Sequence, residues 1–220
     1  MISKRSFACA LGAIACAALV TVSLQAQVGK PVTGIVDANT APEAALLKMP
    51  HMTAPIVKGL IDKRAGSFFA SITELNAYLL GAGLTQAQAM EFYTTGAFIH
   101  VNLNTGTREE ILLIPGAGNQ MVREFNEYRP WTSFTQFDKE ISKYVGQAAT
   151  DKLKQYVFIP VNLNTATDED ILSIPGAGRQ MVREFKEYRP WTSKAQFDKE
   201  ISKYVGQKST DRLWRYVIIK

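Results

Sequence analysis

The stretch Val161–Trp191 reads VNLNTATDEDILSIPGAGRQMVREFKEYRPW. Apolar residues at helical spacing, such as Ile171 and Ile174, lead into a Pro-Gly-Ala-Gly turn, and Met181 and Phe185 continue the spacing after it. Proline ends a helix, and glycines adopt the backbone angles that a very short connection requires. The stretch therefore predicts two helices joined by a tight hairpin.

The same pattern recurs along the chain. Residues 101–160 and 161–220 align without a gap and match at about three positions in four, which indicates a tandem duplication. A diverged copy occupies residues 35–100, where MPHMT at 49–53 stands in place of the IPGAG hairpin and a glycine pair comes later, at Gly81 and Gly83. No segment shows sustained strand alternation, so we predict an all-α fold of three tandem modules.

The N-terminus has the order of a secretory signal. Lys4 and Arg5 precede an apolar run, and small residues up to Ala26 follow it. We expect a signal peptide over residues 1–26, a linker over 27–34 and an exported protein, periplasmic or secreted. A retained membrane anchor is the alternative.

Both cysteines, Cys9 and Cys16, lie inside this predicted signal. The mature chain would then have no disulfide, no thiol chemistry and no cysteine zinc site. A lipid attached to Cys16 is a further alternative for the N-terminus.

Helix boundaries in the third repeat follow from capping residues. Thr165 is predicted to cap a helix with Asp168 at its third position, and the last helix is predicted to begin near Thr210. In the second repeat Arg108 replaces the acid at the third position.

The tryptophans are expected to have different environments. Trp131 and Trp191 each follow Arg-Pro and are interpreted as core residues at a helix junction rather than as base-stacking groups. Trp214, between Arg212 and Arg215, is expected to be partly exposed.

Charge is uneven along the chain. Lysine and arginine balance aspartate and glutamate in the first two repeats, whereas residues 161–220 carry 11 basic and 8 acidic side chains. Any attraction for a polyanion is therefore predicted to be concentrated at the C-terminus.

VNLNTATDEDILSIPGAG, the following EYR segment and Phe197 at the start of the next helix closely resemble the helix-hairpin-helix domain of the ComEA-like competence proteins. The resemblance implies modules of the SAM-like or RuvA domain 2-like type. It also implies export and binding of double-stranded DNA during DNA uptake. The extrinsic photosystem II subunits of the PsbU type resemble the same fold and serve as structural proteins.

The resemblance further implies that backbone N–H groups of the hairpins hold DNA phosphates without reading bases. The residues predicted to do so are Gly116, Ala117, Gly118, Asn119, Gly176, Ala177, Gly178 and Arg179, with Gly81 and Gly83 as a further hairpin. Neighbouring phosphates are predicted to be reached by Lys194, Lys208, Arg212 and Arg215.

An enzyme is not predicted. The chain has two histidines, His51 and His100, and neither lies at metal-site or triad spacing from other candidate groups. We expect no cofactor and no small-molecule substrate. Two interpretations stay open: an exported, non-enzymatic protein that binds double-stranded DNA, or an exported structural module that binds other proteins and keeps the hairpin fold without DNA.

Overall fold

A computed structural model describes residues 34–220, and most of this part is helical, as the sequence predicts. The predictions for the signal peptide and its cysteines lie outside the described residues. The helices are α1 (Glu43–Leu46), α2 (Ala54–Gly66), α3 (Ile72–Gly81), α4 (Gln86–Thr95), α5 (Arg108–Leu112), α6 (Asn119–Glu127), α7 (Phe134–Val145), α8 (Gln147–Lys154), α9 (Asp168–Leu172), α10 (Arg179–Glu187) and α11 (Lys194–Trp214).

Short parallel strand pairs, which the sequence did not predict, join the beginning of each repeat to its end. Val36 pairs with Ala97, Val101 with Val157 and Val161 with Val217. Each strand has only two residues, too few for an alternating pattern to be visible. The strands are β1 (Val36–Asp37), β2 (Ala97–Phe98), β3 (Val101–Asn102), β4 (Val157–Phe158), β5 (Val161–Asn162) and β6 (Val217–Ile218).

Tight turns with left-handed glycines separate the helices. Gly116 and Gly176 have φ of 84° and 76° in the first turn of repeats two and three, and Gly146 and Gly206 have φ of 75° and 72° in the second. Gly206 is a non-helical residue inside α11, so the last helical segment begins directly after it. The predicted start near Thr210 is therefore wrong.

In repeat one the same turns have other residues. His51 takes the left-handed conformation (φ 62°) in the first turn, and Gly83 does so in the second (φ 95°). Gly81 is the last residue of α3 rather than a residue of the turn. The side chain of His51 lies 2.6 Å from Glu91 on α4.

The Asn-Thr loop at the start of each repeat holds the middle of that repeat in place. Asn104 accepts from the N–H of Trp131 (2.6 Å) and donates to its carbonyl (3.0 Å), and Asn164 does the same with Trp191. Arg129 donates to the carbonyls of Leu103 and Gly106 from the same side. Both tryptophans are 1% exposed, which confirms their prediction as core residues.

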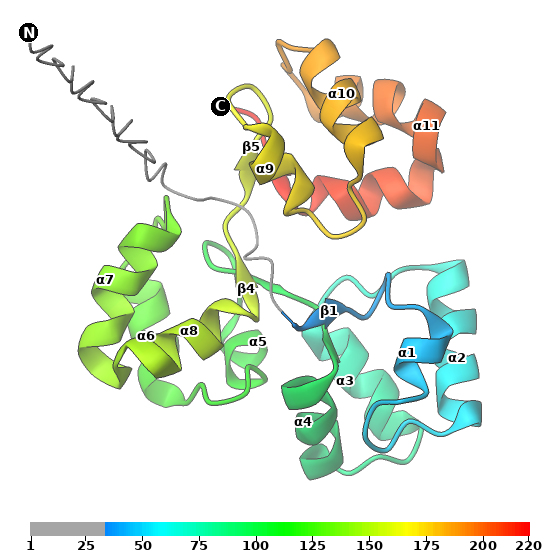
Figure 1. The fold of residues 1–220 in the computed structure, drawn as a ribbon, viewed down its shortest axis with the longest axis vertical. Helices are drawn as coiled ribbons and strands as arrows, with labels where there is room; N and C mark the ends of the chain where they lie inside the picture. Colours follow the sequence, from blue (N-terminus) through cyan, green and yellow to red (C-terminus); the bar gives the residue numbers. More distant parts are fainter. Residues whose placement is uncertain (1–33) are drawn as a thin grey trace, which may run out of the picture.

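Consecutive repeats pack through aromatic residues at their ends. Phe98 contacts Tyr156 with ring centroids 5.0 Å apart, and Phe158 contacts Tyr216 at 4.6 Å. One hydrophobic core runs through repeats one and two, and a second is formed by repeat three together with Phe158 from the end of repeat two. In Figure 1 the second repeat (α5–α8, green to yellow-green) lies beside the first (α1–α4, blue to green), and the third (α9–α11, yellow to red) lies above the first.

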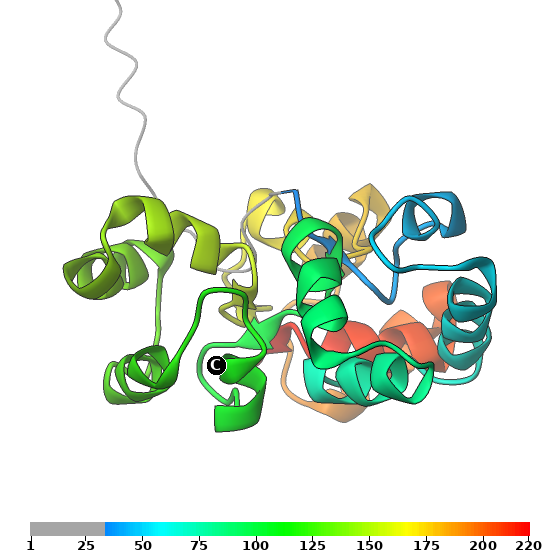
Figure 2. The same ribbon diagram turned by 90° about the horizontal axis from the view of Figure 1, so that it is seen from below.

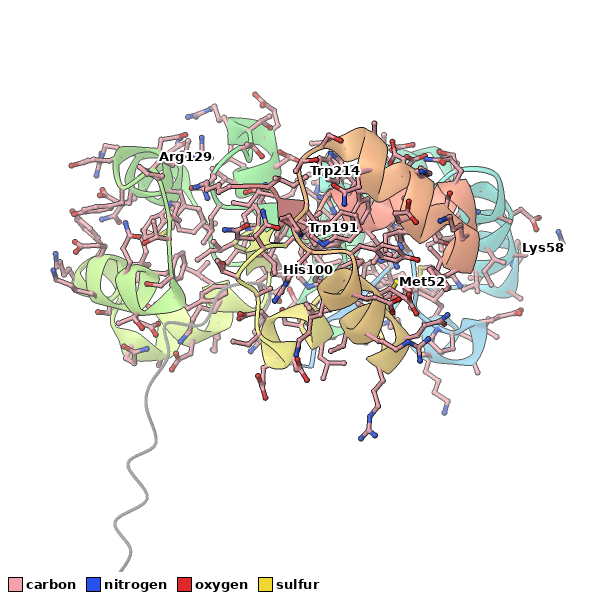
Figure 3. The ribbon with its side chains drawn as sticks, turned by 90° about the horizontal axis from the view of Figure 1, so that it is seen from above. Met52, Lys58, His100, Arg129, Trp191 and Trp214 are labelled. Carbon is pink, nitrogen blue, oxygen red and sulfur yellow. The ribbon has the colours of Figure 1, made fainter. Side chains whose placement is uncertain are left out.

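The third repeat also docks directly on the first, far from it in sequence. Tyr216 donates to the Asp37 carboxylate (2.6 Å), Arg215 to the carbonyl of His100 (2.7 Å) and Lys208 to the carbonyl of Ala65 (2.6 Å). Burial, together with Asp37, raises the pKa of Tyr216, so its hydroxyl stays protonated as a donor. Figure 2 shows repeats one and three overlapping, with the second repeat to one side; Figure 3 places His100 centrally.

Candidate nucleic-acid interface

Side-chain caps occupy the N-termini of α3, α4, α5, α7, α9 and α11. Thr107 and Glu110 form a capping box at α5, and Thr167 and Asp170 form one at α9. The predicted cap at Thr165 is therefore wrong by two residues. The N–H of Thr165 instead donates to the carbonyl of Asn162, in the turn that leads into the helix.

The helices that follow the first glycine turns of repeats two and three have no such cap, and neither do α1, α2 and α8. α6 begins after Gly118 and α10 after Gly178, and neither glycine has a side chain with which to cap the helix. The first N–H groups of a helix have no partner within it and lie at the positive end of its dipole. Both glycines are exposed. These two helix starts therefore offer hydrogen-bond donors to an anion in solution.

Not every predicted N–H group is available. The N–H of Ala117 donates to the carbonyl of Ile114, and that of Ala177 donates to Ile174, each at 2.9 Å. These bonds close the hairpins, so the two alanines shape the turn rather than present donors. Among the described residues, the N–H groups at Gly118–Gln120 and Gly178–Gln180 have no acceptor.

One exposed arginine lies at the first hairpin of repeat two and one at the first hairpin of repeat three. Arg179, the first residue of α10, is exposed, and no described residue forms a hydrogen bond or ion pair with its side chain. In repeat two Asn119 has this position, and it accepts from the guanidinium of Arg108 on α5 (2.5 Å). A positive charge at the N-terminus of a helix destabilises the helix. Arg179 therefore does not stabilise the fold in this way, but its charge would attract a bound anion.

Sequence reasoning did not select Arg108. The difference between the repeats could have pointed to it, because repeat three matches repeat two closely here but has Asp168 at the equivalent position. Asp168 pairs with Lys186 (2.6 Å), whereas Arg108 points to the hairpin. Repeat two thus places Arg108, from α5, at its hairpin, and repeat three places Arg179, from α10, at the equivalent hairpin.

The hairpin at Gly81 and Gly83 leads into a helix with a side-chain cap. Thr85 caps α4 by accepting from the N–H of Gln88, and the Gln88 side chain accepts in return from the Thr85 N–H. The start of α4 therefore differs from the uncapped starts of α6 and α10.

The basic residues predicted to reach neighbouring phosphates are engaged inside the protein. Lys194 pairs with Asp198 (2.7 Å), which raises the pKa of its ammonium group. Lys208 and Arg215 donate to carbonyls of repeat one, as described above. Arg212 is 9% exposed and donates to the carbonyl of Pro175, on the inner side of the hairpin. These four cations are not gathered at the outer surface of the hairpins.

Trp214 is half-buried, in agreement with its prediction. Its ring packs on Phe197 (5.2 Å between centroids) and lies beneath Lys194. Figure 3 labels Trp214 and Trp191, which contact Phe197 from different parts of repeat three.

Comparison with family models, with curated proteins and with solved structures finds no match to this chain. Within residues 34–220 no helix is long and apolar enough to cross a membrane. In the same part of the chain no group of three or more metal-ligating side chains comes together.

Proposed function

We propose that this is an exported, non-enzymatic protein that binds double-stranded DNA through its glycine hairpins. In this proposal the repeats are helix-hairpin-helix modules of the kind that the sequence resembles in ComEA-like proteins, and the biological setting is DNA uptake. The proposal rests on the starts of α6 and α10, where the exposed glycines Gly118 and Gly178 leave the first N–H groups uncapped beside an exposed arginine, Arg108 or Arg179.

The chemistry of these sites fits a backbone phosphate. A phosphate oxygen accepts several N–H groups at once, and the helix dipole favours its negative charge. Arg108 at one hairpin and Arg179 at the other supply a charge for the same phosphate or the next one. Nothing in this arrangement reads base edges, so the binding would be independent of sequence.

The affinity should be modest. Each hairpin supplies one cluster of donors and one arginine, and the other basic groups of repeat three are held internally. Counterion release then predicts that log affinity falls linearly with log salt, with a slope equivalent to about 2 to 5 phosphate contacts.

The alternative function is an exported structural module that binds other proteins. Docking of repeat three on repeat one favours it, because Lys208 and Arg215 serve contacts within the protein. Fluorescence anisotropy of the purified protein with a labelled mixed-sequence duplex, repeated over a range of salt, separates the two. Salt-dependent binding with the slope above supports the DNA proposal. If the well-folded protein binds no duplex at low salt, the DNA proposal is wrong and the structural-module interpretation is the one that stays.

A further inference from the structure

A cleft of about 520 Å³ lies between repeats one and three. One wall is the loop from Gly66 to Ala70, which connects α2 to α3, and the other is the last part of α11. Its volume is in the range of small-molecule sites. The side chains that line it include Phe68, Lys208, Asp211, Arg212 and Arg215.

The cleft has an excess of positive charge. Lys208, Arg212 and Arg215 contribute three positive charges and Asp211 one negative charge, which leaves a net charge of +2. None of the three cations forms an ion pair with a carboxylate of the described chain. Their hydrogen-bond partners are neutral oxygens: the carbonyls of Ala65, Pro175 and His100 and the hydroxyl of Tyr216.

Arg212 is the most constrained of these groups. Its side chain lines the cleft, the residue is only 9% exposed, and its Nε has no hydrogen-bond partner among the described residues. A buried cation without a carboxylate partner is costly, and an anion in the cleft would compensate its charge. One of its terminal nitrogens donates to the carbonyl of Pro175, so Arg212 would act on an anion in the cleft mainly through its charge.

Phe68 keeps the cations in place. The Nζ of Lys208 lies 4.5 Å from the centroid of its ring, and the guanidinium carbon of Arg212 lies at 5.5 Å. Cations stacked on an aromatic ring keep their full charge, because the ring contributes only a quadrupole. The ring therefore orients these charges without neutralising them.

From this arrangement we infer that the cleft is a binding site for a phosphate monoester, a small phosphorylated molecule distinct from the DNA backbone. A phosphate monoester carries close to two negative charges at neutral pH and so matches the charge of the cleft. A duplex does not fit a cleft of this volume, and each of its internal phosphates carries a single charge. The ligand would bridge repeats one and three and stabilise their contact.

The second repeat supplies a natural control. Its counterparts of Lys208, Arg212 and Arg215 are Ala148, Lys152 and Gln155, and Lys152 is exposed. This equivalent surface has one cation in place of three. It should therefore not bind phosphate.

Calorimetric titration of the purified protein at low ionic strength tests the site with inorganic phosphate, phenyl phosphate and dimethyl phosphate. We expect saturable binding of the first two with Kd below about 1 mM, and much weaker binding of the singly charged diester. Binding should also raise the melting temperature, because the ligand favours the folded state. A duplex with and without a 5′-phosphate, added as competitor, shows whether a DNA end reaches the same site.

Variants show where the phosphate binds. Lys208→Gln with Arg215→Gln should weaken phenyl phosphate binding about tenfold or more, and Lys152→Gln in repeat two should leave it unchanged. Circular dichroism checks that helicity survives, and Arg212→Lys, which keeps the charge, serves as a milder second variant that should weaken binding while remaining folded. Absence of saturable binding up to about 10 mM, or binding unaffected by the double variant, would overturn the inference. Substitutions at Gly118 and Gly178 should not affect this site, so it and the DNA proposal fail separately.

Discussion

Repeats two and three share most of their sequence but use the end of their last helix differently. Ala148, Lys152 and Gln155 of repeat two correspond to Lys208, Arg212 and Arg215 of repeat three. Lys152 is exposed, whereas Arg212 is buried against the hairpin of its own repeat and the loop of repeat one. The extra positive charge of repeat three is thus located at a contact between repeats.

The first hairpins of repeats two and three also differ in their surroundings. A Cβ on Gly176 would lie 2.7 Å from a guanidinium nitrogen of Arg212 and 3.4 Å from a methyl group of Thr40, while a Cβ on Gly116 would meet nothing within 4 Å. Nearly identical turns therefore have different surroundings. The comparison teaches that net charge by itself does not locate a binding surface in a repeat protein, because docking between repeats also uses cations.

The largest effect is expected from truncation of Arg212. Arg212→Ala removes a buried cation that contacts Pro175 and Phe68, so it should lower the free energy of unfolding by about 2 to 4 kcal/mol. Lys152→Ala, at the exposed equivalent position, should change it by less than about 0.5 kcal/mol. Urea unfolding of both variants measures this. Equal effects would mean that repeat three does not depend on this contact.

A smaller difference is expected between the hairpin glycines. Gly116→Ala should cost about 1 kcal/mol, because φ of 84° is unfavourable for a residue with a Cβ. Gly176→Ala adds the close contact with Arg212 and should cost about 2 kcal/mol in the same unfolding measurement. If Gly116→Ala proved the more damaging, the difference in surroundings described above would be incorrect.

Removal of the Tyr216 hydroxyl tests the docking of repeat three on repeat one at a second contact. Tyr216→Phe removes the donor to Asp37 and should cost about 1 to 2 kcal/mol, whereas Tyr156→Phe removes a hydroxyl that has no described partner and should cost less than about 0.5 kcal/mol.

The pH dependence tests the burial of Tyr216 together with its contact with Asp37. Because the pKa of Tyr216 is raised in the folded state, its stabilisation is present below the unfolded value of about 10 and is lost as pH rises above it. Tyr216→Phe should therefore flatten the alkaline loss of stability. A variant with the same alkaline profile as the parent would exclude this contribution.

Local features of the fold were predictable from sequence, and contacts between repeats were not. The hairpin glycines and the buried tryptophans follow from turn chemistry and aromatic content. The cap at Thr167 was missed because Thr165 offers the same chemistry, and only the hydrogen bonds of the Asn162 turn decide between them. Lys208 meets the carbonyl of Ala65 across 143 residues, and no local pattern encodes such a partner.

The candidate site, like the fold, was predicted from the sequence only as far as it depends on local features. The glycines at the hairpins are visible in the sequence, and the structure leaves them exposed and uncapped. Which cations accompany them depends on tertiary contacts: Arg108 reaches the hairpin of repeat two, while Arg212 and Arg215 are held between repeats.

The central claim, that uncapped helix starts bind backbone phosphate, is tested by adding a cap. Gly118 and Gly178 have extended backbone angles, and a Cβ at either position would meet nothing within 4 Å. Gly118→Asp with Gly178→Asp should therefore keep or slightly raise stability, while the new carboxylates occupy the N–H groups and repel phosphate. Ser71→Asp with Ser193→Asp adds the same charge at helices that are already capped and serves as the matched control.

The decisive measurement is the affinity of these variants for a mixed-sequence duplex, determined by fluorescence anisotropy at low salt. The account predicts that the Gly118→Asp, Gly178→Asp protein is fully folded and binds about tenfold more weakly than the parent, and that the serine control loses much less. Equal affinity of the glycine variant and the parent, or equal loss in the glycine and serine variants, would contradict the claim that the hairpins hold the phosphates.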